Sequence, residues 1–320
     1  MVAYVNGSYV REEEARISIF DRGLVFGDGV FDTTRTFGGV PFRLGDHLAR
    51  LGRSLRYIEL ESDRIVTCVH DAAIEVLRRN RREIATVGDV FVHMIVTRGG
   101  LSDSDYAPAA HASPSVIVML RRIDFAALAR LYEEGVNLGV SLLTRPFSGA
   151  VDPRVKSLSR LAWVRADLSA VRASRETRPY WPLLFGSDGS IAEAKGANIC
   201  LRMGRALVRP RADDALEGIS LETLEELAKN LGYETREQRL TPYDLLNADE
   251  TFLTSTSFSV VPVASVDGIR LRRGGSFEEL LQAWIKLVAF DFVKQARDIA
   301  GRVAPMAHAE DSCLSAPSRP

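Results

Sequence analysis

The stretch Asp152-Pro-Arg-Val-Lys-Ser-Leu-Ser-Arg-Leu161 lies between a segment rich in proline and glycine and an expected helix. Residues 144–153, which lead into it, are rich in proline and glycine, and this composition is typical of a connection between domains. Lys156 follows the proline-bounded turn, and we expect it to open a helix over residues 157–173. A lysine at a helix start is ordinarily solvated, so Lys156 has a special role only if other motifs support one.

The residues before this connection predict a small α+β domain, residues 1–143. Asn6-Gly7 lies between two apolar runs and favours a tight hairpin turn. Apolar residues at helical or alternating spacing predict the remaining elements. The expected strands cover residues 3–6, 9–11, 16–19, 30–37, 89–97, 115–120 and 136–143. The expected helices cover residues 46–58, 64–79 and 125–134.

The residues after the 144–153 linker predict a large C-terminal domain, residues 154–302. Its expected strands lie at residues 180–185, 191, 197–202, 206–209, 234–239, 250–254 and 259–263. Its expected helices cover residues 157–173, 220–231 and 276–299. Residues 303–320 are rich in alanine, serine and proline, and they predict a disordered tail. The pattern therefore predicts a two-domain protein of the α+β or α/β class.

The composition is that of an ordinary globular protein. Of its 320 residues, 46% are hydrophobic and 26% are charged, and the formal net charge is -1. This balance favours neither nucleic acid nor an acidic membrane, and no run of 18 apolar residues predicts a membrane span. The N-terminus lacks the regions of a signal peptide. Cys68, Cys200 and Cys313 show no metal-ligand spacing, so we expect no metal site and a reduced, cytoplasmic protein.

Lys156 and Glu193 together suggest pyridoxal phosphate chemistry. A lysine that forms a Schiff base must be neutral part of the time, and burial or a nearby cation lowers its pKa enough. The same amine can carry protons between carbon atoms. Glu193, in the run Ile191-Ala-Glu-Ala-Lys-Gly-Ala-Asn198, is the candidate partner of a protonated pyridine nitrogen. The alternative is a solvated glutamate in a turn.

Two clusters and an arginine could bind the phosphate of this cofactor. Gly218-Ile-Ser220 stands at an expected helix start, where free backbone N–H groups bind anions, although Ser220 could be a plain cap. Thr256 and Ser257 follow an apolar strand and could add donors or simply form a turn. Arg50 interrupts an apolar helical stripe, so it either clamps a phosphate or extends along the surface to solvent.

The order of these motifs resembles that of the fold-type IV pyridoxal-phosphate enzymes, aminotransferase class IV. That family includes branched-chain aminotransferases, D-amino-acid aminotransferases, (R)-selective amine transaminases and 4-amino-4-deoxychorismate lyase. The resemblance runs from about residue 4 to about residue 271. It rests on Phe20-Asp-Arg-Gly-Leu-Val-Phe-Gly-Asp-Gly-Val-Phe31, Phe42-Arg-Leu-Gly-Asp-His-Leu-Ala-Arg-Leu51, Val96-Thr-Arg-Gly99, Lys156-Ser-Leu-Ser159, and the segments 193–198, 216–220 and 254–262.

The resemblance implies a D-amino-acid-aminotransferase-like fold with pyridoxal phosphate as cofactor and amines and keto acids as small-molecule partners. It implies a homodimer, with each site at the interface of two domains. Lys156 matches the lysine that forms the internal aldimine, and Glu193 matches the partner of the pyridine nitrogen. The positions that match or adjoin phosphate-binding positions are Arg50, Gly218, Ile219, Ser220, Thr256 and Ser257.

The resemblance also indicates candidate substrate residues. Phe26, Phe31, Thr33 and Arg35 fall where branched-chain and D-amino-acid enzymes line their pockets, and His93 falls at a pocket-facing position. Phe31, Thr33 and Arg35 share one face of an alternating strand. Arg35 could bind a carboxylate bidentately or form a structural ion pair. A lone histidine in a strand is more often structural than functional.

The sequence combines features of several members of the family. Residues 26–31 are similar to the branched-chain and D-amino-acid groups, whereas residues 90–99 are similar to (R)-selective amine transaminases. The loop over 100–108 lacks the arginine that those relatives carry, so carboxylate recognition would depend on Arg35. The leading hypothesis is a transaminase for an (R)-amine, a D-amino acid or a branched-chain L-amino acid. The alternatives are a 4-amino-4-deoxychorismate-type lyase and a non-catalytic protein that retains the fold.

Overall fold

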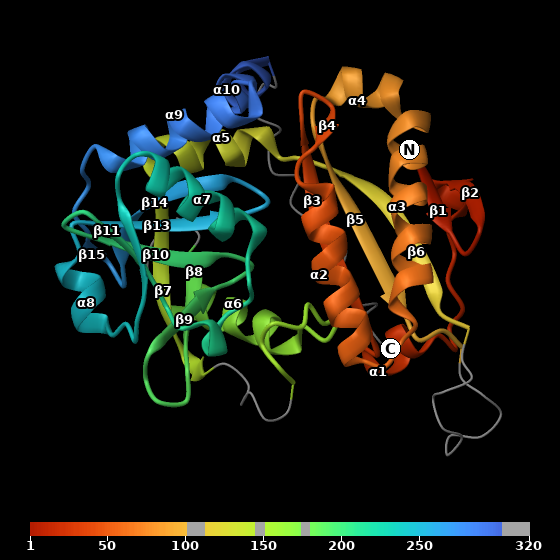
Figure 1. Ribbon diagram of the computed structural model, residues 1–320, viewed down its shortest axis with the longest axis horizontal. Coiled ribbons are helices and arrows are strands. Elements are labelled where there is room, and N and C mark those ends of the chain that lie inside the picture. The colour runs from red at the N-terminus through yellow and green to blue at the C-terminus, as the bar shows by residue number, and fades with distance from the viewer. Residues whose placement is uncertain (101–112, 145–150, 174–179, 303–320) are drawn as a thin grey trace, which may run out of the picture.

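Two β-sheets, one in each half of the chain, form the framework of the protein (Figure 1). The computed structural model describes residues 1–100, 113–144, 151–173 and 180–302. The first sheet has six strands in the order β2-β1-β6-β5-β3-β4. The second has nine strands in the order β12-β11-β10-β13-β14-β7-β8-β9, with β15 paired to β14. Each sheet with its helices is called a body below.

The first body contains the elements up to the end of β6. Its strands are β1 (Val2–Val5), β2 (Ser8–Arg11), β3 (Gly29–Phe37), β4 (Val40–Pro41), β5 (Val90–Thr97) and β6 (Ser115–Arg122). Its helices are α1 (Arg22–Phe26), α2 (Leu44–Tyr57), α3 (Ser62–Arg79) and α4 (Arg81–Val87), with a 3-10 turn at η1 (Glu12–Glu14).

Alternation along β5 explains why α2 and α3 cover one face of the first sheet. Val90, Val92, Met94 and Val96 are all buried and point the same way, because successive residues of a strand face opposite sides. They belong to a core to which the two helices contribute Leu48, Leu51, Leu55, Ile65, Val69, Ala72, Ala73 and Val76. The opposite face of the sheet carries the intervening residues, including His93.

The second body contains the elements from α5 onward. Its strands are β7 (Val136–Thr144), β8 (Tyr180–Phe185), β9 (Ile191–Ala194), β10 (Asn198–Met203), β11 (Ala206–Arg209), β12 (Glu234–Glu237), β13 (Glu250–Ser255), β14 (Ser259–Val266) and β15 (Ile269–Arg270). Its helices are α5 (Phe125–Glu134), α6 (Leu161–Ala173), α7 (Ile219–Asn230), α8 (Pro242–Asn247), α9 (Ser276–Val288) and α10 (Phe292–Arg302), with a 3-10 turn at η3 (Ala212–Asp214).

The structure divides the chain earlier than the sequence predicted. β7 pairs in parallel with both β14 and β8, so it is an interior strand of the second sheet. α5 packs against α10 and β14 in the same body. The change of sheet therefore falls between β6 and α5, whereas the expected first domain ran to residue 143. Most of the expected linker, residues 145–150, and the expected tail, residues 303–320, lie outside the described residues.

Several expected elements have different bounds. The helix expected over 276–299 is two helices, α9 and α10, because Ala289 takes a left-handed conformation with φ of 49°. The helix expected from residue 157 begins only at Leu161. No strand forms at residues 16–19, and α4 and α8 were not expected. α8 has a recognisable signal: Thr241 and Asp244 cap each other around Pro242.

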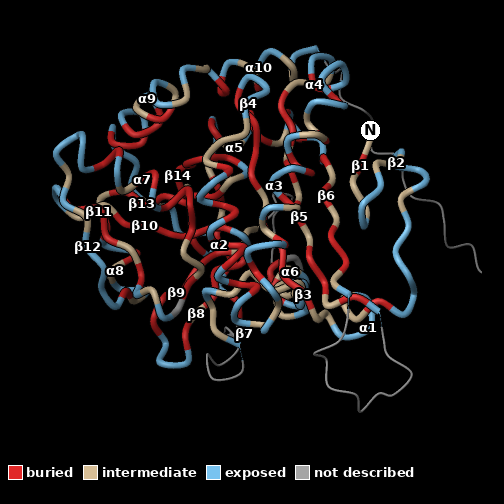
Figure 2. Tube along the Cα trace, turned by 45° about the vertical axis from the view of Figure 1, so that its right-hand side comes forward, coloured by how far each residue is buried: buried red, intermediate tan, exposed pale blue. Residues whose placement is uncertain are grey.

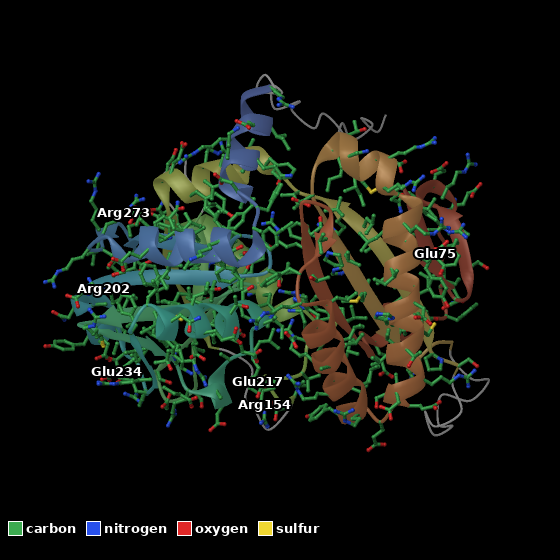
Figure 3. The ribbon with its side chains drawn as sticks, turned by 45° about the horizontal axis from the view of Figure 1, so that its top comes forward. Glu75, Arg154, Arg202, Glu217, Glu234 and Arg273 are labelled. Atoms are coloured by element: carbon green, nitrogen blue, oxygen red, sulfur yellow. The ribbon has the colours of Figure 1, made fainter. Side chains whose placement is uncertain are left out.

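Most buried residues lie on or against the two sheets. Buried residues mark the strands of both bodies, and the outer faces of the helices are exposed (Figure 2). Charged side chains such as Glu234 and Arg273 extend from the surface (Figure 3). Within the described ranges, no helix is long and apolar enough to cross a membrane. The same residues contain no cluster of histidine, cysteine and acidic side chains able to hold a metal ion.

Candidate active site

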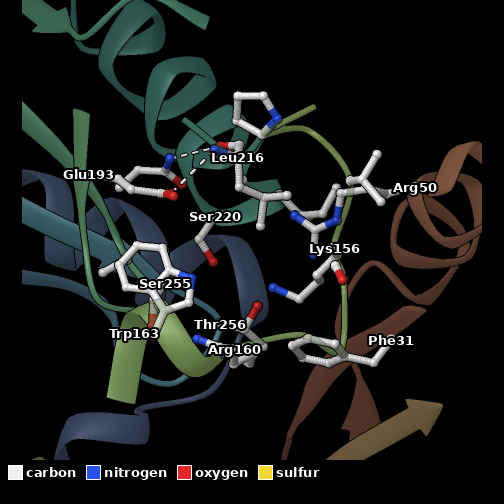
Figure 4. A pocket seen from close by; sticks show the side chains of 18 of the residues that line it. Phe31, Arg50, Lys156, Arg160, Trp163, Glu193, Leu216, Ser220, Ser255 and Thr256 are labelled. Atoms are coloured by element: carbon white, nitrogen blue, oxygen red, sulfur yellow. Dashed lines mark hydrogen bonds between the residues drawn. The ribbon is translucent and has the colours of Figure 1, made fainter. Parts of the chain in front are cut away.

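A cavity of about 280 Å³ is lined by residues of both bodies (Figure 4). The first body contributes Phe31 of β3 and Arg50 of α2. The second contributes Glu193 of β9, the start of α7 and the end of β13. The segment between β7 and α6 supplies Lys156. Residues far apart in the sequence therefore meet around one cavity.

Lys156 lies on an extended segment rather than at a helix start. Its carbonyl accepts a hydrogen bond from the Phe31 N–H (2.9 Å), and the Leu158 N–H donates to the Gly29 carbonyl (3.0 Å). The Lys156 N–H donates to the hydroxyl of Ser54 in α2 (3.2 Å). The expectation that Lys156 opens a helix is thus wrong, because these bonds pair the segment with β3. They fix the backbone from which the amine extends.

The surroundings of Lys156 favour a neutral amine. The pKa of Lys156 is lowered to about 8, first by burial and then by the charges of Arg50 and Arg160, while Asp32 and Glu193 act in the opposite direction. The Lys156 Nζ lies 5.0 Å from the centre of the Phe31 ring. An amine with this pKa is partly neutral near pH 7, and the neutral form is the nucleophile.

Glu193 faces the same cavity from the opposite side (Figure 4). It lies on β9, paired with Leu184 of β8, and only 4% of it is exposed. Its Oε2 accepts a hydrogen bond from the Leu216 N–H (3.2 Å). The alternative of a solvated turn glutamate does not match this burial. A carboxylate held in this way can pair with a cationic ring nitrogen.

The start of α7 opens onto the cavity. The helix begins at Ile219, one residue before the predicted Ser220, and no side chain caps it at Gly218. The first N–H groups of a helix have no partner within it, so they are available to an anion. Gly218 lines the cavity and packs closely on Asn198, because a Cβ there would lie 2.0 Å from the Asn198 Oδ1. The Ser220 hydroxyl lines the cavity and is buried.

Arg50 is a fixed, buried cation. Its Nε and Nη2 donate to the carboxylate of Asp32 (2.9 and 2.8 Å), and its Nη1 donates to the Glu217 carbonyl (2.7 Å). His47 also contacts Asp32 (2.8 Å). Although burial opposes ionisation, the charges of Arg50 and His47 hold the pKa of Asp32 well below its usual range. Arg50 is only 3% exposed, which excludes the alternative of a side chain extending to solvent.

The turn between β13 and β14 forms another part of the wall. Thr254, Ser255 and Thr256 line the cavity. Ser257 is exposed and lies outside the lining residues. Its carbonyl accepts a hydrogen bond from the Nη1 of Arg35 (3.0 Å). The phosphate-binding role of Ser257 therefore stays a prediction, and a backbone contact gives the residue a structural role.

The expected substrate residues do not all reach the cavity. Phe31 lines it, whereas Thr33, Arg35 and His93 are not among the lining residues. Thr33 and His93 hydrogen-bond to each other (2.6 Å), and the His93 ring lies 5.2 Å from that of Phe31. Burial, together with the charge of Arg121, lowers the pKa of His93 to about 4, so the imidazole is neutral near pH 7. Phe26 lies on α1 and is 58% exposed.

Arg35 has a position that favours a structural role. It is 1% exposed, and its guanidinium carbon lies 4.3 Å from the centre of the Phe37 ring. Its hydrogen bond to the Ser257 carbonyl joins β3 to the turn that follows β13. No acidic side chain pairs with it among the described residues. Arg35 therefore supports the cavity wall through the Thr254–Ser257 turn.

The cavity also contains residues that sequence reasoning missed. Arg160 and Trp163 line it close to Lys156. Arg160 lies four residues after Lys156 in the sequence. An arginine near an expected helix start is common, so its residue type did not predict a role in the cavity. Asp32 and His47 have a clearer signal, since each is a polar residue on the apolar side of its strand or helix.

Comparison with known proteins places the chain in a family. A family model described as "Amino-transferase class IV" matches residues 29–266. A Methanocaldococcus jannaschii protein assigned as a branched-chain-amino-acid aminotransferase is 33% identical over 84% of this chain and 88% of its own. The aminodeoxychorismate lyase of Bacillus subtilis is 28% identical over 83% of this chain and 87% of its own.

Comparison of the fold with solved structures finds the same family of proteins. The crystal structure of the Escherichia coli branched-chain amino acid aminotransferase superposes with a TM-score of 0.79 and 26% identity, covering 90% of this chain and 94% of that one. Both the sequence match and the fold span the cavity around Lys156. The chain belongs to the class IV aminotransferase family, and it is an aminotransferase whose cofactor is pyridoxal phosphate.

Proposed function

We propose that Lys156 binds pyridoxal phosphate in this cavity and that the enzyme moves an amino group between an amino acid and a 2-oxo acid. The observation that carries the proposal is a partly neutral amine and a buried carboxylate, Glu193, facing each other across one cavity. When bound, the cofactor supplies a protonated ring that draws electrons from the substrate carbon bearing the amine.

The residues of the cavity fit the phosphate of this cofactor. The guanidinium of Arg50, the free N–H groups at the start of α7 and the hydroxyls of Ser220 and Thr256 are all donors that line the cavity. Asp32 fixes the orientation of Arg50 through two hydrogen bonds, so the cation does not have to be ordered when the anion binds. Gly218, at the start of this helix, also lines the cavity.

Lys156 and Glu193 would have different roles in the reaction: Glu193 would stabilise the protonated ring nitrogen, and Lys156 would transfer the proton of the substrate. Glu193 would hold the proton on the ring nitrogen, because a carboxylate that is only 4% exposed interacts strongly with a neighbouring cation. Lys156, with a pKa of about 8, can take a proton from the α-carbon of the substrate at its Nζ and return it to a neighbouring carbon. The backbone hydrogen bonds of Lys156 keep that Nζ inside the cavity during the transfer.

The substrates belong to the class of apolar amines and amino acids. Phe31, Val155, Ala162 and Trp163 give the cavity apolar walls, and these suit a hydrophobic side chain. Two relatives bear branched-chain aminotransferase names, which makes a branched-chain L-amino acid the leading donor. D-amino acids and (R)-amines remain the other members of this class.

A lyase is the second candidate, and the Bacillus subtilis relative is the observation that favours it. The two reactions differ in their products. A lyase releases pyruvate from an aminodeoxychorismate-type substrate without an amino acceptor, whereas a transaminase needs a 2-oxo acid to complete its cycle. Pyruvate formation without an acceptor would therefore support the lyase.

The protein would act as a cytoplasmic homodimer. Residues 17–26 expose several large apolar side chains, namely Ile17, Ile19, Phe20, Leu24, Val25 and Phe26. An exposed apolar patch of this kind is typical of a surface that another subunit covers. Sedimentation equilibrium should therefore give twice the mass of the chain, and Phe20→Asp should shift the protein toward the monomer. A monomeric wild type would contradict this part of the proposal.

A panel of single half-reactions tests the proposed activity. L-leucine, D-alanine and (R)-1-phenylethylamine are mixed separately with the holoenzyme, and loss of the visible absorption band of the lysine-bound cofactor is timed. At least one donor should bleach the band, and a 2-oxo acid should restore it. Lys156→Ala should abolish the response, whereas Lys229→Ala, an exposed lysine on α7, should leave it unchanged. A stable band with every donor would refute the transaminase.

A further inference from the structure

Arg160 is a cation of the cavity that the proposed cofactor site does not use. We infer that Arg160 binds the carboxylate of the substrate, so that the enzyme acts on α-amino acids and 2-oxo acids in preference to amines that lack a carboxylate. This inference rests on the proposed transaminase function and narrows its substrate class. It assigns carboxylate recognition to a residue outside the set predicted from the sequence.

The guanidinium of Arg160 lies near the amine of Lys156 in the cavity. Its guanidinium carbon lies 5.4 Å from the centre of the Phe31 ring and 5.9 Å from that of Trp163. The Nζ of Lys156 lies 5.0 Å from the same Phe31 ring. Figure 4 shows both side chains extending into the pocket beside Phe31. The two cations thus adjoin one aromatic surface.

The other charged groups of the cavity already have partners. Arg50 binds Asp32 and a carbonyl, Asp152 binds Arg154, and Glu193 accepts a backbone hydrogen bond. The guanidinium of Arg160, by contrast, makes no hydrogen bond or ion pair within the ranges that the structure describes. Burial lowers the pKa of Arg160, and the charges of Glu193 and Asp167 act in the opposite direction without hydrogen-bonding to it, so its N–H groups are available to a bound anion.

A substrate carboxylate supplies what Arg160 lacks. In an α-amino acid the carboxyl carbon is two bonds from the amine nitrogen, so a cation beside Lys156 is well placed for it. The planar guanidinium can bind both carboxylate oxygens, and such bonds are stronger than neutral ones. An amine without a carboxylate would leave the N–H groups of Arg160 without this hydrogen-bond partner. The absence of an arginine from residues 100–108 is therefore compatible with keto acid binding.

Calorimetric titration of the holoenzyme with two matched probes tests the inference without turnover. 4-Methylvalerate carries a carboxylate, and 4-methylpentanamide has the same carbon skeleton without the charge. Wild-type protein should prefer the acid. Arg160→Met should weaken binding of the acid roughly 10- to 100-fold and leave the amide unchanged, as expected for loss of a charge-assisted pair. The affinity of Arg160→Lys for the acid should lie between those of the wild type and Arg160→Met. Arg165 is an exposed arginine on α6, and Arg165→Met should bind the acid as the wild type does.

Two results would overturn the inference. One is a wild type that does not prefer the acid, and the other is an equal loss of acid and amide binding in Arg160→Met. Half-reactions provide an independent check, since kcat/KM for the best amino acid donor should fall in Arg160→Met by a similar factor. If the wild type has no visible band, or no donor bleaches it, the proposed transaminase function is wrong. If amino acid donors bleach the band of the wild type and of Arg160→Met equally fast, only the role given to Arg160 is wrong.

Discussion

The amine of Lys156 is buried near two cations, Arg50 and Arg160, and two carboxylates, Asp32 and Glu193. Burial is the largest influence that lowers its pKa, and Arg50 and Arg160 add to it. A solvated lysine is almost fully charged at neutral pH, whereas a pKa of about 8 leaves roughly a tenth of this amine neutral at pH 7. The fixed backbone and the lowered pKa together separate Lys156 from the many lysines that merely begin helices.

Reconstitution of the apoprotein should therefore depend on pH around the pKa of Lys156. The neutral amine attacks the aldehyde of pyridoxal phosphate, so the rate should rise with pH and level off above about 8. Stopped-flow absorbance across about pH 6 to 10 would measure it. A midpoint near the ordinary lysine value of 10.5 would show that the site does not shift this group.

Asp32 gives a second prediction at the scale of the residue. Asp32→Asn leaves Arg50 buried without its partner, which should cost about 3 to 5 kcal/mol of unfolding free energy at neutral pH. Because the pKa of Asp32 is lowered on folding, its contribution is complete above the unfolded value near 3.8 and is lost as the pH falls below it. Urea denaturation at pH 7 and pH 3 would measure both effects.

The control for Asp32 is Asp71→Asn on the exposed side of α3, which should change stability little. Asp32→Asn should also release pyridoxal phosphate more readily, because Arg50 loses its fixed orientation. A variant that keeps both its stability and its cofactor would contradict the role given to this pair.

At the scale of the element, α9 and α10 show how packing overrides periodicity. Apolar residues continue at helical spacing through residues 276–299, and alanine is the best helix former, so nothing local predicts a break at Ala289. The break follows from tertiary contacts. Phe292 is fully buried beside Phe37, and Phe290 packs over Gly38 in the first body.

Ala289 should be strained in its left-handed conformation. Ala289→Gly removes the Cβ that disfavours this conformation, so it should stabilise the protein by about 1 kcal/mol. Ala283→Gly, in the interior of α9, should destabilise it by about as much, since glycine there only adds unfolded-state entropy. Chemical denaturation of both variants gives the comparison. Destabilisation by Ala289→Gly would mean that the helix break is not held as described.

At the scale of the molecule, the site joins residues from both bodies, and this limits what sequence can predict. Lys156, Glu193, Arg50 and Ser220 were predictable, because the chemistry of each residue type matches one part of a single cofactor. They all line the cavity. The sequence did not predict which elements of the two bodies would face each other across the cavity.

Arg35 and Arg160 illustrate this limit. Strand alternation correctly put Arg35 on the same face as Phe31, but Arg35 lies four residues further along β3, where it meets the carbonyl of Ser257 and not the cavity. Arg160 reaches the cavity because its segment pairs with β3 before α6 begins. Both placements depend on contacts between distant parts of the chain.

The most direct test of the central claim is to locate the cofactor on the chain. The holoenzyme is reduced with borohydride, digested and analysed by mass spectrometry. The claim predicts that the mass of reduced pyridoxal phosphate is found on the peptide containing Lys156, and that adding an amino donor before the reductant prevents the labelling. Labelling of a different lysine, or none at all in protein saturated with the cofactor, would contradict it.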